Sequence, residues 1–569
     1  MEQNKKGPQE FEKPMRINLK IESIGSYSRL QKFLFPLIVL VFGAVSFWPD
    51  VAFDLPYGQH QWRQCDAYSM ALNYFQEDAG FFEPSMHFQH GSGKGSGRSV
   101  GEFTGTYWLN AQVWKFSGLK PYTMRWTHMS LWLLGALSLF AMGRNWFGAL
   151  KSAFVTAFVS ASPLIAFYAG SYLVNPAALG LVFLSWWLAW QLMAFDRSKS
   201  KGRWSMEVLL FLCLSFSVLL RPTMALGWIP IAIWALRRGN LVLWFPRFAL
   251  PLAIAVGWVF WSKSVNDANG SIYFCTTIRP LWDSQNPAII WRAFCENLLP
   301  EWYHEYVRYV FGFCALMLAV FRVFLASVRV QDEREKKLEL QLPLLIGLMV
   351  LGLAIYFLLW FENLDAHDYY LIEFQLLLPL LLWRCIQVLE YIRNSNLRWY
   401  RGIWTLLIIA LSFQLLEAHL RTRMKHTSPT GWWSDVILTH RDREVWSWFH
   451  GDQERRFADL EQVKSAMRAH GIQRDERIIS VPDPSSNITL SLLDQKGFTD
   501  LYDENFVGDE RIELYVQKGA SYLVCNSRTW YEERIKSPWL QRPIIDFGGM
   551  IVFDLSNSES PLSSDAGQR

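Results

Sequence analysis

The chain has 569 residues, of which 51% are hydrophobic, 16% aromatic and only 19% charged, below the roughly 25% of a typical soluble protein. Its 55 lysines and arginines against 51 aspartates and glutamates give a net charge of +4, which offers no reason to expect nucleic acid as a partner. This composition also excludes a disordered chain, a collagen-like fibre and a disulfide-rich mini-protein. It favours a mainly α membrane protein with several spanning helices.

Apolar runs follow a basic N-terminal segment, residues 1–32, and recur as far as residue 418. A helix needs about 20 mostly apolar residues to cross the hydrocarbon core of a membrane, so each run is a candidate span. The runs predict about eleven spans, within a transmembrane domain of residues 33–419: 33–49, 127–143, 152–170, 176–195, 207–220, 223–236, 248–263, 306–326, 341–360, 369–388 and 403–418. Residues 207–236 are divided into two short helices at Arg221-Pro222, because proline lacks a backbone donor and favours a break there.

Lysines and arginines set the predicted orientation of these spans. Seven of them precede the first span, whereas the short turns predicted outside, 171–175, 221–222 and 361–368, carry only Arg221. No small-residue cleavage site follows the first run, so it is predicted to be an anchor and not a removed signal peptide. The N-terminus is therefore predicted to be cytoplasmic and the C-terminal domain to lie outside.

Two predicted outer loops are long, residues 50–126 and 264–305. Gly91–Gly97 resembles a phosphate-binding loop in composition, but no strand precedes it, so a flexible loop is the better interpretation. Cys275 and Cys295 both lie in the second loop, and the sequence does not decide whether they form a disulfide.

The composition changes near residue 420, where alternating apolar and polar stretches begin. Strands are predicted at 477–481 and 522–525, and helices near 443–470, 487–495 and 509–518. Residues 420–556 therefore form a predicted periplasmic α/β domain, and 557–569 a disordered tail. Asp483-Pro-Ser-Ser-Asn487 is typical of a turn that opens a helix. The acidic residues of this domain are expected at its surface, and the domain is expected to tune acceptor binding without carrying the reaction.

The first long loop holds a dense polar set soon after the membrane exit. Its members are His60, Trp62, Arg63, Gln64 and Asp66. The stretch Tyr68–Phe75 then predicts an amphipathic helix on the membrane surface. From spacing alone, Asp66 is as well explained by an N-cap of this helix as by a functional role.

The pattern from Asp54 through His60-x-Trp-Arg-Gln-x-Asp66 resembles the first periplasmic loop of GT-C fold glycosyltransferases. It is most similar to the bacterial branch of protein O-mannosyltransferases and the lipid A aminoarabinose transferase. His367-Asp-Tyr369-Tyr resembles the H-x-Y-Y that opens a late helix in that family, and Arg221-Pro222 its K/R-x-P element near the lipid phosphate. The resemblance covers about residues 33–390.

The resemblance implies an inner-membrane enzyme that transfers a sugar from a polyprenyl-phosphate carrier to a lipid, polysaccharide or protein acceptor. It implies that Asp66 is the catalytic carboxylate, with Asp54 the lesser candidate. The substrate-binding residues that it implies are Asp54, His60, Arg63, Glu102, Arg221, His367 and Tyr369.

Each of these residues also has a structural interpretation. Arg221 and Arg279 are suited to lipid headgroups, and the aromatic residues after Glu102 to a membrane interface. His367 suits a phosphate, a proton transfer, a metal or a structural hydrogen bond, and no second histidine supports a zinc site. Asn175 stands where the family often has an acidic residue, which argues against a two-carboxylate metal site and leaves a divalent ion an open question.

Two other functions compete with the glycosyltransferase. A transporter or flippase for a lipid-linked glycan is the alternative, and a sensor with an outside domain is third. The polar residues gather in outer loops and at outer helix ends rather than in mid-membrane, which favours an enzyme acting at the interface.

Overall fold

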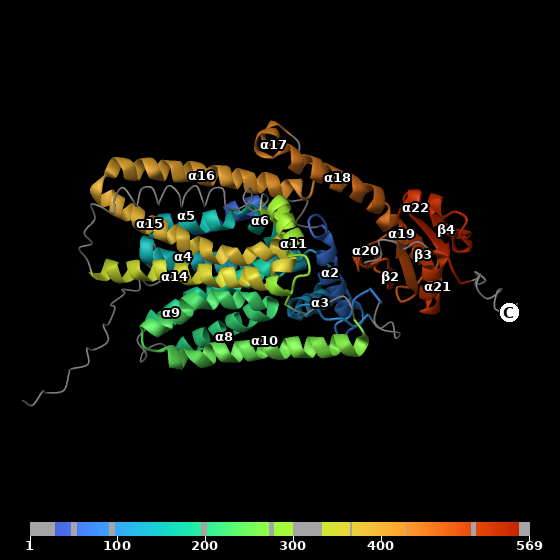
Figure 1. Ribbon diagram of the computed structural model, residues 1–569, viewed down its shortest axis with the longest axis horizontal. Helices are drawn as coiled ribbons and strands as arrows, with labels where there is room; N and C mark the ends of the chain where they lie inside the picture. The colour runs from blue at the N-terminus through green and yellow to red at the C-terminus, as the bar shows by residue number, and fades with distance from the viewer. Residues whose placement is uncertain are drawn as a thin grey trace, which may run out of the picture.

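Long helices run side by side through most of the molecule, and a small α/β domain lies at one end of them (Figure 1). The structure is a computed structural model that describes residues 29–46, 54–89, 97–194, 202–271, 278–299, 333–364, 367–428, 431–501 and 508–556. The bundle consists of α1 (Arg29–Ser46), α4 (Thr123–Phe147), α5 (Ala149–Ser160), α6 (Pro163–Ala169), α7 (Asn175–Ala194), α8 (Arg203–Leu220), α9 (Ile229–Arg237), α10 (Leu241–Asn269), α14 (Glu333–Leu359), α15 (Leu377–Ser395) and α16 (Leu397–Met424).

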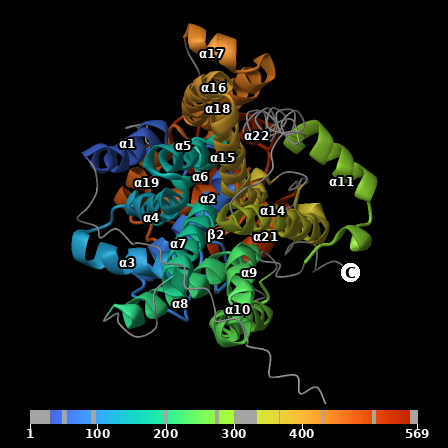
Figure 2. The same cartoon turned by 90° about the vertical axis from the view of Figure 1, so that its left-hand side faces the viewer.

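Shorter helices cover the end of the bundle that faces the α/β domain. They include α2 (Gln61–Gln76), α3 (Gly105–Ser117), α11 (Pro287–Ala293) and the helical turns η4 (Leu281–Asp283), η5 (Phe294–Leu298), η7 (Phe361–Leu364) and η8 (Asp368–Leu376). In the end-on view of Figure 2, α7 lies inside the bundle, where it packs on α4, α8 and α9. Gly135 of α4 and Gly180 of α7 bring two backbones together, since a Cβ on Gly135 would lie 2.3 Å from the Gly180 Cα.

Every predicted span except 306–326 coincides with a helix or a pair of helices, and 306–326 lies outside the described residues. Within the described ranges, six helices are long and apolar enough to cross a membrane, or seven if the bent pair α5–α6 counts as one span. The eleven-span topology stays a prediction.

The predicted break at Arg221-Pro222 is confirmed. Helix α8 ends at Leu220, and Arg221 is extended, with φ −148° and ψ 102°. Pro222 then opens the 3-10 helix η3 (Pro222–Trp228), which leads into α9. Proline is well tolerated at such a first position, where its missing N–H would have no partner in the helix.

The C-terminal domain is α/β, as predicted, and its sheet has the order β2-β1-β3-β5-β4. The strands are β1 (Arg477–Val481), β2 (Gly497–Thr499), β3 (Ala520–Cys525), β4 (Pro543–Asp546) and β5 (Ile551–Asp554). The helices and turns are α17 (Trp432–Ile437), α18 (His440–Phe457), α19 (Leu460–Ala469), α20 (Ile488–Leu493), α21 (Asp509–Gln517), α22 (Arg528–Glu533) and η9 (Pro538–Leu540). Strands β2, β1 and β3 are parallel, and β5 is antiparallel to both of its neighbours.

The structure contradicts two expectations about surface residues, and two loop features lie outside the described residues. The helix predicted on the membrane surface is wrong, because α2 is buried along nearly its whole length between the bundle and the C-terminal domain. Asp483 and Asp500 are buried, so the expectation that acidic residues of the C-terminal domain lie at its surface is wrong for these two. Cys275 and residues 91–96 of the glycine-rich loop lie outside the described residues.

Candidate functional site

A tight turn brings the segment before α2 against the end of α16. Gly58 has φ +81°, and a Cβ there would lie 2.6 Å from the carbonyl oxygen of Lys425, so glycine is required for both reasons. His60 follows in the left-handed region, with φ 53° and ψ 39°, as the N-cap residue of α2. A non-glycine residue in this conformation is uncommon and marks a constrained position.

Asp66 lies inside α2 and is fully buried. Its Oδ1 accepts hydrogen bonds from Ser486 Oγ at 2.7 Å and Asn487 Nδ2 at 2.9 Å, and its Oδ2 lies 3.5 Å from Arg63 Nη1. The N-cap interpretation of Asp66 is therefore wrong, since His60 holds that position. Ser486 and Asn487 belong to the C-terminal domain, which is thus part of the surroundings of this carboxylate.

Arg63 lies between two carboxylates. Its Nη2 is 2.9 Å from Glu102 Oε2, and the other Glu102 oxygen accepts a hydrogen bond from the Tyr107 hydroxyl. Burial raises the pKa of Tyr107 well above its usual range, so this hydroxyl stays protonated and donates. The side chains of Arg63 and Glu102 are 21% and 15% exposed, so both reach solvent.

Asp368 is the centre of a second polar cluster, and it is nearly fully buried. It accepts hydrogen bonds from His60 Nε2 at 2.9 Å, from Gln59 Nε2 at 2.8 Å and from the Tyr168 hydroxyl, and Lys425 Nζ lies 3.9 Å away. Asp368 stands between two residues that sequence reasoning selected. The reasoning missed it because the family pattern leaves that position unspecified.

His367 and Tyr369 flank Asp368, and both rings contact His60. The ring of His367 is stacked on His60 with centroids 5.6 Å apart, and Tyr369 meets His60 edge-on at 4.9 Å. Burial, together with the neighbouring His60, lowers the pKa of His367 to about 4. His367 is therefore neutral near pH 7 and contributes hydrogen bonding rather than positive charge.

Arg221 forms an ion pair at the break between α8 and η3. Its Nη2 lies 2.8 Å and its Nε 3.2 Å from Oε1 of Glu373, which also accepts a hydrogen bond from Thr223 Oγ1 at 2.6 Å. Glu373 is fully buried, and the Arg221 guanidinium lies over the Tyr370 ring at 4.8 Å. Sequence reasoning missed Glu373, whose charge compensates that of Arg221.

Asp54 and Arg279 lie apart from these carboxylate clusters. The Asp54 side chain is exposed, and its backbone carbonyl accepts hydrogen bonds from Arg125 Nε at 3.2 Å and the Tyr172 hydroxyl at 3.1 Å. Arg279 is 54% exposed and lies 3.9 Å from Glu362.

In the part of the chain that the structure describes, no group of three or more histidine, cysteine, aspartate or glutamate side chains is arranged to hold a metal ion. Asn175, at the position where an acidic residue was expected, donates its amide to the carbonyl of Tyr369 at 3.3 Å.

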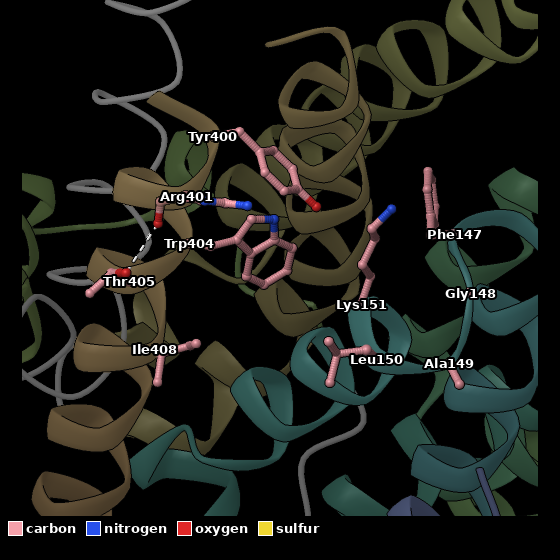
Figure 3. A pocket seen from close by; sticks show the side chains of 10 residues that line it. All are labelled: Phe147, Gly148, Ala149, Leu150, Lys151, Tyr400, Arg401, Trp404, Thr405 and Ile408. Carbon is pink, nitrogen blue, oxygen red and sulfur yellow. Dashed lines mark hydrogen bonds between the residues drawn. The ribbon is translucent and has the colours of Figure 1, made fainter. Parts of the chain in front are cut away.

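A pocket of about 610 Å³ lies between the starts of α5 and α16. Figure 3 shows Tyr400 and Trp404 facing Lys151 across it, and Lys151 Nζ pairs with Glu390 at 2.6 Å. None of the predicted site residues lines this pocket, which belongs to the end of the bundle predicted to face the cytoplasm.

No known family model matches the chain, and no curated protein is similar to it in sequence. Its fold is similar to that of ArnT, an aminoarabinose transferase, from Cupriavidus metallidurans. The crystal structure of ArnT bound to undecaprenyl phosphate gives a TM-score of 0.54 at 12% identity, and the match covers 93% of this chain and 99% of ArnT. The apo structure of ArnT gives 0.52 at 13% identity, covering 94% and 100%. The chain thus has the GT-C fold that its motifs predict.

Proposed function

We propose that this protein is a membrane glycosyltransferase of the GT-C type, which transfers a sugar from a polyprenyl-phosphate carrier to a lipid, polysaccharide or protein acceptor. The observation that carries the proposal is the meeting of two distant motifs at one end of a GT-C fold. His60 and Asp66 come from the first motif, and Asp368 and Tyr369 from the second. A hydrogen bond of 2.9 Å joins His60 Nε2 to Asp368 Oδ1. The ArnT structure with bound undecaprenyl phosphate supports the carrier class.

The reaction needs a carboxylate, which we assign to Asp66. The acceptor hydroxyl oxygen attacks the anomeric carbon, the bond from that carbon to the phosphate oxygen breaks, and polyprenyl phosphate leaves with the electron pair. The acceptor proton passes to the Asp66 carboxylate, which Ser486, Asn487 and Arg63 hold in place. A carboxylate that accepts the proton of the attacking hydroxyl contributes a rate factor of about 10²–10⁴.

The departing phosphate needs positive charge, and Arg63 is better suited to supply it than Arg221. Arg63 is 21% exposed, and its partner Glu102 is itself 15% exposed, whereas Arg221 is 14% exposed and its partner Glu373 is fully buried. A phosphate can compete with Glu102 for the Arg63 guanidinium, since both ligands are anions suited to a bidentate contact. Arg221, His367 and Tyr369 are assigned to the donor side, with His367 as a neutral hydrogen-bonding group.

The site lies at the end of the bundle next to the C-terminal domain (Figure 1). The lysine and arginine pattern puts that end outside, so we assign the enzyme to the bacterial inner membrane with a cytoplasmic N-terminus. In this orientation, the enzyme uses both the polyprenyl-linked sugar and the acceptor at the outer face of the membrane.

The test compares envelope and secreted glycans of a deletion strain carrying wild-type protein, Asp66→Asn or the control Asp78→Asn. Asp78 lies in the same loop, but its side chain is 85% exposed. Asparagine at position 66 keeps an oxygen for Ser486 and Asn487 but loses the negative charge. Loss of the glycan with Asp66→Asn at normal membrane levels supports the assignment. Full complementation by Asp66→Asn would overturn it.

A transporter is the competing candidate, because transporters also contain broken helices and buried ion pairs such as Arg221–Glu373. An assay in liposomes distinguishes the two functions. In liposomes, purified enzyme should convert lipid-linked sugar into free polyprenyl phosphate and glycosylated acceptor. Movement of intact lipid-linked sugar across the bilayer without such conversion would instead favour the flippase.

A further inference from the structure

The loop of residues 483–489 in the C-terminal domain is held in one conformation by a buried carboxylate. Asp483 Oδ1 accepts hydrogen bonds from the backbone N–H and hydroxyl of Ser485, at 3.0 and 2.5 Å. Asp483 Oδ2 accepts the equivalent pair from Thr489, at 3.0 and 2.6 Å. Ser486 and Asn487 lie between these two attachment points and are both buried. The loop therefore presents their side chains in a fixed direction.

The neighbours of Ser486 and Asn487 also fix the direction of their hydrogen bonds. Trp62 Nε1 donates to Ser486 Oγ at 3.1 Å, so the serine hydroxyl is left to donate to Asp66. The backbone N–H of Phe88 donates to Asn487 Oδ1 at 3.1 Å, so the amide nitrogen faces Asp66. Both groups thus act as donors toward one carboxylate oxygen.

Backbone pairing fastens the first outer loop to the sheet of the C-terminal domain. Gly497 of β2 donates its N–H to the His87 carbonyl at 3.0 Å and accepts from the Gln89 N–H at 2.8 Å. A Cβ on Gly497 would lie 2.0 Å from the Ile478 carbonyl oxygen, so the residue has no room for a side chain. Segment 87–89 thereby extends the edge of the sheet beside β2.

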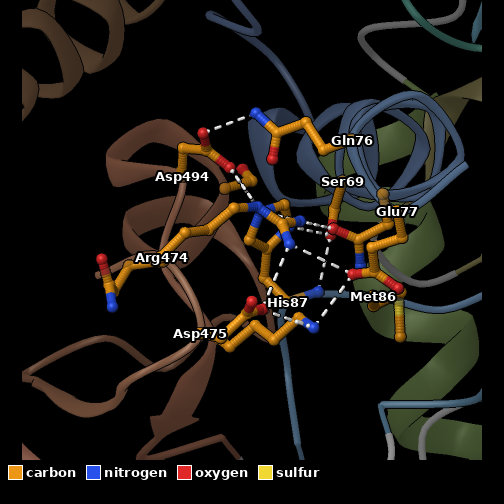
Figure 4. Close-up of polar contacts among 12 residues, drawn as sticks. Ser69, Gln76, Glu77, Met86, His87, Arg474, Asp475 and Asp494 are labelled. Atoms are coloured by element: carbon orange, nitrogen blue, oxygen red, sulfur yellow. Dashed lines mark hydrogen bonds and ion pairs between the residues drawn. The ribbon is translucent and has the colours of Figure 1, made fainter.

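Charged side chains form ion pairs across the same interface (Figure 4). Arg474 Nε lies 2.9 Å from Asp494 Oδ1 and its Nη1 3.2 Å from Glu77 Oε1, while its other nitrogen donates to Asn73. His87 Nε2 lies 3.1 Å from the same Asp494 oxygen. Glu77 and Asn73 belong to α2 or directly follow it, so the helix that carries Asp66 is fixed to the C-terminal domain at two places.

We propose that the C-terminal domain completes the active site and that Ser486 and Asn487 are positioning residues for Asp66. Their two hydrogen bonds to Oδ1 stabilise the ionised carboxylate, whose Oδ2 lies 3.5 Å from Arg63 Nη1, and fix its orientation. This inference deepens the proposed function and rests on it. A hydrogen bond to the charged form lowers the pKa of a carboxyl group, so losing the donors raises the pKa of the group that must be ionised for turnover.

The test is the pH dependence of kcat/KM for full-length enzyme in liposomes. Ser486→Ala and Asn487→Ala should each shift the acid limb of the profile upward by about one pH unit, and the double variant by more. Ser486→Thr retains a hydroxyl and should restore the wild-type limb. The control Tyr515→Phe removes a hydrogen bond to the Thr499 carbonyl elsewhere in the same domain, and should leave the limb in place.

The outcomes separate the inference from the proposed function. An unmoved limb in Ser486→Ala, Asn487→Ala and the double variant, with Asp66→Asn inactive, overturns the inference and leaves the glycosyltransferase assignment intact. Full activity of Asp66→Asn overturns both. Thermal unfolding of each variant in detergent measures how much of the protein is folded. The pH midpoint of the acid limb does not depend on the amount of folded enzyme, so it can be compared between variants of different stability.

Discussion

His60 and Asp368 are 308 residues apart in the chain, yet His60 Nε2 lies 2.9 Å from Asp368 Oδ1. The hydrogen bond joins the N-cap residue of α2 to the first residue of η8. His60 makes this bond from the left-handed region of backbone conformation, with φ 53° and ψ 39°. The motif before and within α2 and the motif at the start of η8 therefore form one structural unit.

The first prediction concerns this unit. Asp368→Asn should destabilise the protein by about 3–5 kcal/mol, because the change removes a buried negative charge 3.9 Å from the buried Lys425. His60→Gln should cost less, about 1.5–3 kcal/mol, since the other donors to Asp368 remain. Thermal unfolding in detergent measures both. Equal unfolding temperatures for the two variants would contradict the assignment of Asp368 as the centre of the cluster.

The second prediction separates charge from packing at Arg221. Arg221→Ala should raise KM for the lipid-phosphate donor with little change for the acceptor, and should also lower stability because Glu373 is left buried without its cation. Glu373→Gln is the matched variant, since it keeps the shape and leaves the arginine charge available. It should not raise the donor KM. If the acceptor KM rises in Arg221→Ala while the donor KM stays constant, the two substrate sites are exchanged.

The third prediction is a pH effect on the C-terminal domain. Burial, and then the nearby Asp483, raises the pKa of Asp500 to about 6, against about 3.9 in an unfolded chain. The folded state therefore holds this proton more tightly, so the contribution of Asp500 to stability is present below pH 4 and is lost as the pH rises through 6. Asp500→Asn keeps an acceptor for the Asp483 N–H and removes the titration.

Unfolding temperatures measured from pH 4 to 7 check this effect. The difference between Asp500→Asn and wild type should grow in favour of the variant as the pH rises. A constant difference across that range would show that Asp500 does not titrate as described.

The fourth prediction is the membrane orientation. A fluorescent reporter that folds only in the cytoplasm, fused after Leu555, should be inactive, whereas a periplasmic phosphatase at the same position should be active. The expectation follows from the excess of lysine and arginine in alternate loops. An active cytoplasmic reporter would refute both the outside location of the C-terminal domain and the odd number of crossings.

The sequence is informative about helices because apolar runs of membrane length are long and strong signals. The break at Arg221 was also predictable, because proline acts locally. The surroundings of α2 were not predictable in this way. Its polar side chains, such as Ser69 and Asn73, indicate a polar face, but only tertiary structure decides that the C-terminal domain covers that face rather than water.

The candidate site was predictable only in part, for a related reason. His60, Arg63 and Asp66 stand together in one motif and could be selected from it. Glu373 and Asn487 have no local pattern of their own, since each acquires its role from a partner more than 150 residues away. Single-sequence patterns report neighbours along a helix or strand, and they carry no signal for such pairs.

The separation between Asp66 and Ser486 has a consequence for biosynthesis. The two residues are 420 positions apart, so the ribosome produces most of the chain before the donors to Asp66 exist. Until then α2 has one face against the bundle and the other uncovered. A chain that ends before residue 486 therefore lacks both of these hydrogen-bond donors to Asp66.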